Sequence, residues 1–102
     1  MEFAANFTAI DFETANRRPD SACQLAAVVV RDGRIAESAM WMVRPRPLRF
    51  SPGNIQIHGI RPTDVRGEPE FGELWPEISE QLAGQTLVAH NATFDTVSYT
   101  HL

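Results

Sequence analysis

The chain has 102 residues, of which 43% are hydrophobic and 22% are charged. This length fits one domain or part of one, and the composition excludes a disordered chain. The net charge of -4 excludes the overall basic field of a protein that binds nucleic acid tightly and without specificity. All nine basic residues are arginines, whose planar guanidinium groups still bind phosphates well.

The chain contains one cysteine, Cys23, inside an apolar run, which predicts a buried thiol and a reducing compartment. The segment Met1–Phe3 is not the basic start of a long apolar stretch, as a secretion signal would require. The longest apolar run, Leu25–Val30, is too short to span a bilayer. We therefore expect a cytoplasmic protein with no membrane partner.

Alternating and apolar segments predict three strands in the first half of the chain. Asn6–Asp11 alternates between two sets of side chains, and Ala22–Arg31 and Arg34–Val43 are longer strand-like runs. Asp32 and Gly33 join the last two runs and are a strong hairpin signal. We expect these three strands to form an antiparallel meander.

Short helices are expected after a proline-rich break at residues 45–52. Ile55–Ile60 fits one helical turn, and Thr63 is placed to cap another. Three arginines in and next to the break, Arg44, Arg46 and Arg49, form a basic loop. We expect this loop either to be solvated or to contact phosphates.

A clear helical pattern follows at residues 71–82, with Gly84 as a C-terminal stop. Pro76 lies inside this pattern and should remove a hydrogen bond or bend the helix. The next strand, Thr86–His90, should join the sheet parallel to a neighbour because a helix precedes it. The apolar side chains at helical spacing are Phe71, Leu74, Trp75, Ile78 and Leu82.

Residues 96–102 do not continue this order of elements. A helix should begin near Ala92, but residues 96–100 are rich in β-branched and hydroxyl side chains of poor helix propensity. The strand order is also left incomplete. We therefore expect a C-terminally truncated domain in which the reading frame is lost after about Asp95 or Thr96, which makes residues 96–102 a suspect tail.

Two carboxylates follow the first predicted strand. Asp11 and Glu13 are two residues apart, so both should leave one face of the strand while Phe12 points to the other. Carboxylates that converge at a strand end repel one another unless a hard cation such as Mg²⁺ lies between them. The alternative is that both carboxylates are simply solvated.

A second motif favours the metal interpretation. Ala89–Asp95 reads Ala-His-Asn-Ala-Thr-Phe-Asp and follows a predicted buried strand. Together with Asp11, Glu13 and Thr14, it resembles the first two motifs of the DEDD (DnaQ-like) 3'–5' exonucleases, a family that includes the proofreading epsilon subunit of bacterial DNA polymerase III. The segment from Ile57 to Ile60 also resembles the His-Gly-Ile segment of that family, and residues 71–78 resemble the helix before its second motif.

The resemblance implies the N-terminal part of an α/β, ribonuclease H-like domain: an antiparallel three-strand meander, a helix and a parallel strand. It implies hydrolysis of the 3'-terminal phosphodiester of DNA or RNA with two Mg²⁺ or Mn²⁺ ions. Nucleic-acid 3' ends would be the partners, with a DNA polymerase subunit as a further candidate. The implied catalytic and metal-binding residues are Asp11, Glu13 and Asp95, and the implied substrate-binding residues are Phe12, Thr14, His58, Asn91 and Phe94.

The family's third motif, a histidine or tyrosine followed shortly by an aspartate, has no match after Asp95. His101 has one residue behind it and cannot begin such a motif. We therefore expect this chain to hold metal weakly, to turn over slowly or not at all, and to be poorly soluble. Two alternatives stay open: a module that binds single-stranded 3' ends without cutting, and a subunit that serves only as a docking surface.

Overall fold

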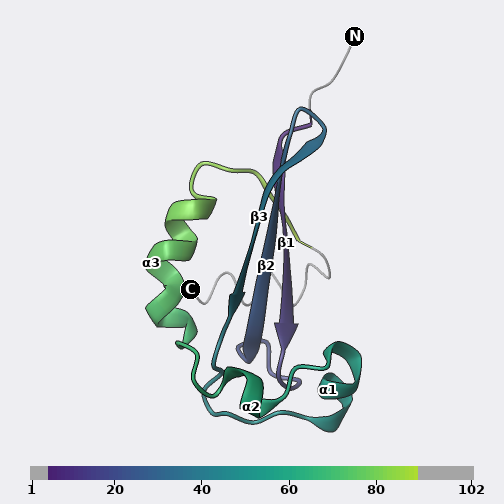
Figure 1. Cartoon of the computed structure of the whole chain (residues 1–102), viewed down its shortest axis with the longest axis vertical. Helices are drawn as coiled ribbons and strands as arrows, with labels where there is room; N and C mark the ends of the chain where they lie inside the picture. Colours follow the sequence, from purple (N-terminus) through teal and green to yellow (C-terminus); the bar gives the residue numbers. More distant parts are fainter. Residues whose placement is uncertain (1–4, 90–102) are drawn as a thin grey trace.

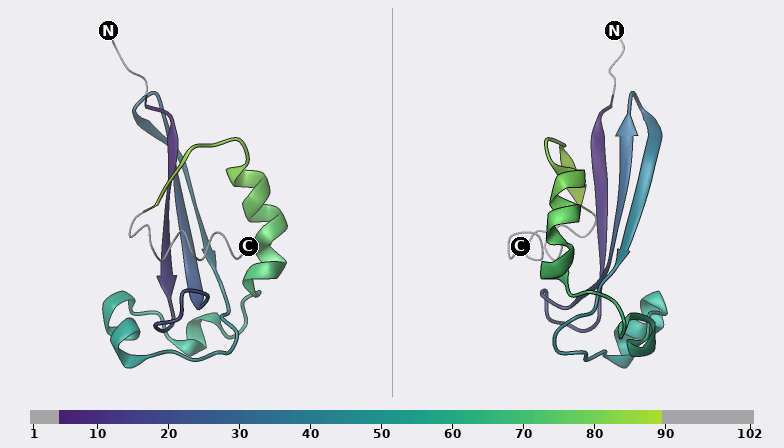
Figure 2. Two further views of the ribbon diagram at one scale, coloured as in Figure 1. Left: turned by 180° about the vertical axis from the view of Figure 1, so that it is seen from behind. Right: turned by 60° about the vertical axis from the view of Figure 1, so that its left-hand side comes forward.

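A computed structural model of the chain describes residues 5–89 (Figure 1). Within this range the chain forms a four-stranded mixed sheet with the strand order β3-β2-β1-β4. One long helix, α3, lies along one face of the sheet, and two short helices, α1 and α2, lie at the carboxyl end of β1 (Figures 1 and 2). The elements are β1 (Phe7–Thr14), β2 (Ala22–Arg31), β3 (Arg34–Met42), α1 (Pro52–His58), α2 (Pro62–Val65), α3 (Phe71–Leu82) and β4 (Leu87–Ala89).

The predicted antiparallel meander is confirmed. β1 pairs antiparallel with β2, and β2 pairs antiparallel with β3. Asp32 and Gly33 form the hairpin turn with φ angles of 54° and 75°, the left-handed pair that a tight two-residue turn requires. The predicted parallel strand is also confirmed, because β4 pairs parallel with Thr8–Ile10 of β1.

Strand β1 is longer than predicted. It continues past Asp11 to Thr14, because Phe12 pairs with Leu25 and Glu13 pairs with Gln24 of β2. The polar side chains in this extension do not end the strand, since only one of its faces is buried. The candidate carboxylates therefore lie on a paired strand rather than in the loop that follows it.

The main core lies between the sheet and α3. Trp41 of β3 is 8% exposed, and its indole Nε1 donates a hydrogen bond of 2.5 Å to the carboxylate of Glu77 on α3. Trp75 is half-buried against the same core. Helix α3 continues through the exposed Pro76, whose ring nitrogen has no hydrogen to donate to the preceding turn. The buried residues of this core are Ile10, Phe12, Ala22, Leu25, Ala27, Trp41, Ile78 and Leu82.

The two short helices begin earlier than predicted. α1 starts at Pro52, with Ser51 as its N-cap, rather than at Ile55. The prediction that Thr63 caps the next helix was wrong. α2 begins at Pro62 with Arg61 before it, because proline favours the first helical position and holds the preceding residue extended.

A second, smaller core fixes these helices beneath the strand end. It consists of four residues, Ala15, Cys23, Ile60 and Val65, of which the first two and the last are fully buried. The segment after α1 is thereby packed directly against the residues that follow Thr14. Among the helices of residues 5–89, none is both long and apolar enough to cross a membrane.

Candidate active site

Asp11 and Glu13 point away from α3, toward the opposite face of the sheet. Asp11 is exposed and Glu13 is half-buried, whereas Phe12 between them is 8% exposed and belongs to the core. This alternation confirms the predicted directions of the three side chains. Same-face neighbours on a strand are about 6.5 Å apart at the backbone, which is close enough for two carboxylates to share ions between them.

The surroundings of the two carboxylates fit a cation. None of the ion pairs formed within residues 5–89 includes Asp11 or Glu13. Carboxylate oxygens are hard ligands of the kind that Mg²⁺ and Mn²⁺ prefer. Within the same residues, no three metal-ligating side chains gather in one place. The third predicted ligand, Asp95, lies outside the described residues, as do the predicted substrate contacts Asn91 and Phe94.

Phe12 was predicted to contact the substrate. Its ring lies on the α3 side of the sheet, with its centroid 6.2 Å from that of Phe71. On the carboxylate face Phe12 therefore offers only backbone atoms. A substrate contact by this residue stays a prediction.

His58 lies at the end of α1, where both of its ring nitrogens bind backbone groups. Its Nδ1 accepts a hydrogen bond of 2.9 Å from the N–H of Ile60, and its Nε2 lies 2.9 Å from the carbonyl oxygen of Thr14. Because Nδ1 accepts, Nε2 must carry the proton and donate it. His58 thus lies beside the strand end, and its predicted contact with a nucleotide stays a prediction.

Asn54 was missed by the sequence analysis. Its side-chain amide donates a hydrogen bond of 2.9 Å to the carbonyl of Thr14, the same oxygen that His58 approaches. Asn54 and His58 are four residues apart and share one face of α1. The signal that could have found Asn54 is the pair Ser51-Pro52, a typical N-cap followed by a proline in the first turn.

The buried thiol of Cys23 lies below the same strand end. Burial, and secondarily the negative charge of Glu13, raise the pKa of Cys23 to about 12. A thiol with such a pKa is protonated at neutral pH and is a poor nucleophile. The prediction that Cys23 is a buried structural side chain is confirmed.

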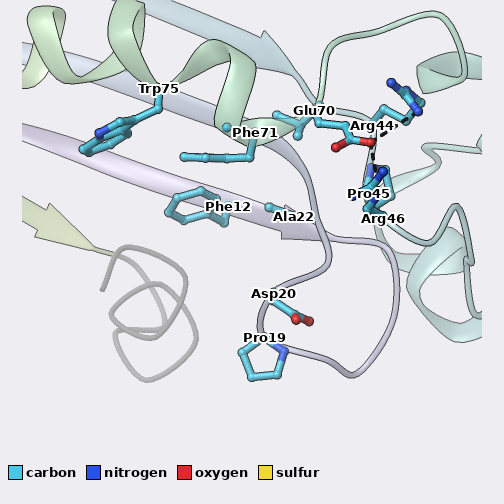
Figure 3. A pocket seen from close by; sticks show the side chains of 12 residues that line it. Phe12, Pro19, Asp20, Ala22, Arg44, Pro45, Arg46, Glu70, Phe71 and Trp75 are labelled. Atoms are coloured by element: carbon cyan, nitrogen blue, oxygen red, sulfur yellow. Dashed lines mark ion pairs between the residues drawn. The ribbon is translucent and has the colours of Figure 1, made fainter. Parts of the chain in front are cut away.

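A pocket of about 320 Å³ opens on the other face of the sheet, beside the start of α3 (Figure 3). Its wall includes the rings of Phe12, Phe71 and Trp75. At its rim, Arg44 and Arg46 each lie 3.5 Å from a carboxylate oxygen of Glu70. Two arginines of the predicted basic loop are therefore ion-paired, which lowers their availability for phosphates.

The chain resembles known exonucleases in both sequence and structure. A family model described as an exonuclease of the RNase T type matches residues 8–101. The PolC-type DNA polymerase III of Thermotoga petrophila is 31% identical over 93 residues, which cover 89% of this chain and 7% of that protein. The 3'-5' exonuclease DinG of Bacillus subtilis is 36% identical over 93 residues, 87% of this chain and 10% of that protein.

Among solved structures, exonuclease X in complex with 5' overhanging duplex DNA superposes with a TM-score of 0.75 and 32% identity. The match covers 87% of this chain and 51% of that chain. The ribonuclease H-like mixed sheet is thereby confirmed, and the chain spans a small part of the curated relatives it matches. The chain belongs to the DEDD (DnaQ-like) 3'–5' exonuclease family.

Proposed function

We propose that this chain carries the first two of the three sequence motifs that form a metal-dependent active site, and that this site removes nucleotides from DNA 3' ends. The observation that carries the proposal is the pair Asp11 and Glu13, which lie on one face of β1 and have no ion-pair partner among residues 5–89. Asp95 would supply the third carboxylate. These residues would hold two divalent ions, Mg²⁺ or Mn²⁺.

Bound divalent ions supply Lewis-acid and water-activating chemistry for the hydrolysis of a phosphodiester. The chain's own contribution is to bring the carboxylates to one place and to keep the backbone beside them rigid. Thr14 follows the carboxylates directly, and it and the backbone beside it would contact the terminal nucleotide. Asn91 and Phe94 would complete the pocket for that nucleotide.

We favour DNA as the substrate because the names of the chain's relatives refer to DNA. One is a PolC-type DNA polymerase III, and the solved exonuclease X holds duplex DNA. A DNA polymerase chain is accordingly the proposed partner. RNA is the alternative substrate that a direct comparison of matched DNA and RNA 3' ends would reveal.

Oligonucleotide binding and cleavage test this proposal together. We expect the 102-residue chain to bind a single-stranded DNA with a free 3' hydroxyl in the presence of Mn²⁺, and to release this DNA when a chelator removes the Mn²⁺. We expect the chain to shorten the DNA slowly or not at all. The matched control is Asp11→Asn with Glu13→Gln, which removes both charges at nearly constant shape. Binding that survives chelation and both substitutions would instead support the non-catalytic binding module.

A further inference from the structure

Within residues 5–89, strand pairing holds the last part of β1 on the β2 side only. On the β4 side, pairing within residues 5–89 covers only Thr8, Ala9 and Ile10. On the β2 side, the register shifts between Glu13 and Thr14. Within residues 5–89, Asp11 and Glu13 are therefore paired with β2 alone, and the ladder becomes irregular directly after Glu13.

Helix α1 and its N-cap supply the hydrogen bonds to the backbone that follows Glu13. The carbonyl oxygen of Thr14 accepts a hydrogen bond of 2.9 Å from the side-chain amide of Asn54, and the Nε2 of His58 lies 2.9 Å from the same oxygen. The next carbonyl, of Ala15, accepts a hydrogen bond of 2.9 Å from the N–H of Ser51. Two successive carbonyls of the strand end are thus bound by α1 and its N-cap.

The amide of Asn54 is itself held in one orientation. The Ser51 hydroxyl accepts a hydrogen bond of 3.2 Å from the Asn54 N–H and donates one to the Asn54 Oδ1. With Oδ1 bound to Ser51, the NH₂ group of Asn54 must face the strand. There it also lies 3.3 Å from the Thr14 hydroxyl and 3.3 Å from the Asn16 carbonyl.

We propose that Asn54 is a positioning residue: by binding the Thr14 carbonyl it fixes the backbone after Glu13, and so keeps Asp11 and Glu13 directed toward a common metal site. This inference rests on the proposed function for its metal and assigns Asn54 a role within it. Asn54 would act through the Thr14 backbone and would not itself be a metal ligand. Groups that orient metal ligands in this indirect way typically change metal affinity about tenfold or more when removed.

The test compares Asn54→Leu with Gln56→Leu, an exposed position on the same helix. Both variants replace a side-chain amide with an apolar group, and only the first removes the bond to Thr14. Mn²⁺ is titrated into the ¹⁵N-labelled 102-residue chain, and its paramagnetic broadening of the amide signals of Asp11–Thr14 gives an apparent affinity. We expect Asn54→Leu to weaken that affinity about tenfold, and Gln56→Leu to leave it within about twofold of the wild type.

Amide hydrogen exchange is the second measurement, and it needs no metal. Asn54→Asp and Gln56→Glu are isosteric partners for it if the leucine variants unfold. Loss of the Asn54 bond should speed the exchange of the Ala15 and Ser51 amides about tenfold, and the Gln56 variants should not. Unchanged exchange, or unchanged Mn²⁺ affinity in a chain whose wild type binds Mn²⁺, overturns the inference. If Mn²⁺ does not broaden the amide signals of the wild-type chain, the proposed function is refuted instead. The hydrogen-exchange rates then decide alone whether Asn54 holds the backbone after Glu13.

Discussion

The thiol Sγ of Cys23 lies 3.4 Å from the carbonyl oxygen of Glu13. A buried group of the second core thus contacts the backbone of a candidate metal ligand. Cys23 is 0% exposed, and burial raises its pKa from 9.0 to about 12. The folded state therefore binds the thiol proton more tightly than the unfolded state does.

Stability should consequently fall at alkaline pH. A group whose pKa is higher in the folded state contributes its full stabilisation of the folded state at pH values below its pKa in the unfolded state. This contribution is lost as the pH rises toward the group's pKa in the folded state. Between about pH 9 and 12 the free energy of unfolding should drop by up to about 1.4 kcal/mol per pH unit through Cys23. Urea unfolding at several pH values measures the slope. Cys23→Ala should flatten it, and an unchanged slope would contradict the assignment.

Glu77 should stabilise the contact between α3 and β3. Glu77→Ala leaves the buried indole N–H of Trp41 without its acceptor, which should cost about 1–3 kcal/mol of unfolding free energy. Glu80 is exposed on the same helix, and Glu80→Ala is the matched control with an expected change below about 0.5 kcal/mol. Chemical denaturation of the two variants measures the difference. Equal costs would show that the Trp41 bond contributes nothing of its own.

Gly84 and Gly72 should respond oppositely to alanine. Gly84 has a φ of 73° after the end of α3, a conformation in which a Cβ is strained, so Gly84→Ala should destabilise by about 1 kcal/mol. Gly72 lies inside α3, and a Cβ added there would meet no neighbouring element among the described residues within 4 Å, so Gly72→Ala should stabilise by about 0.5–1 kcal/mol. Thermal unfolding of both variants measures whether each substitution raises or lowers the stability of the fold. A change in the same direction for both variants would contradict the conformations described for Gly72 and Gly84.

Divalent metal should stabilise the folded chain through Asp11 and Glu13. At a free Mg²⁺ concentration ten times the dissociation constant, the gain should be about 1.4 kcal/mol. Asp11→Asn with Glu13→Gln should abolish the gain, and should not destabilise the metal-free chain because it removes the repulsion between the two carboxylates. Thermal unfolding with and without Mg²⁺ measures both effects. A gain that persists in the double variant would place the metal elsewhere.

Much of this fold could be predicted from local pattern. The period of two along β1 placed Asp11 and Glu13 opposite Phe12, and Asp32-Gly33 located the hairpin, because both signals depend on neighbouring residues only. The length of β1 was underestimated, since pairing with β2 rather than side-chain polarity extends it to Thr14.

The parts that could not be predicted depend on contacts between distant residues. Asn54 meets Thr14 across 40 positions of sequence. The pair Ser51-Pro52 indicates where the helix starts, but it does not indicate that Asn54 contacts the end of β1. The same holds for His58, whose two backbone partners became visible only in the folded chain. The roles of Asn91, Phe94 and Asp95 stay predictions, since they lie outside the described residues.

The most direct measurement is the Mn²⁺ titration of the wild-type chain, followed by paramagnetic broadening of its amide signals. Our account predicts that broadening begins at Asp11–Thr14 and is lost in Asp11→Asn with Glu13→Gln. The control is Asp32→Asn with Glu80→Gln, which removes two exposed charges elsewhere and should leave the broadening intact. Broadening spread over all acidic residues, or unaffected by the Asp11 and Glu13 substitutions, would contradict a metal site at this strand end.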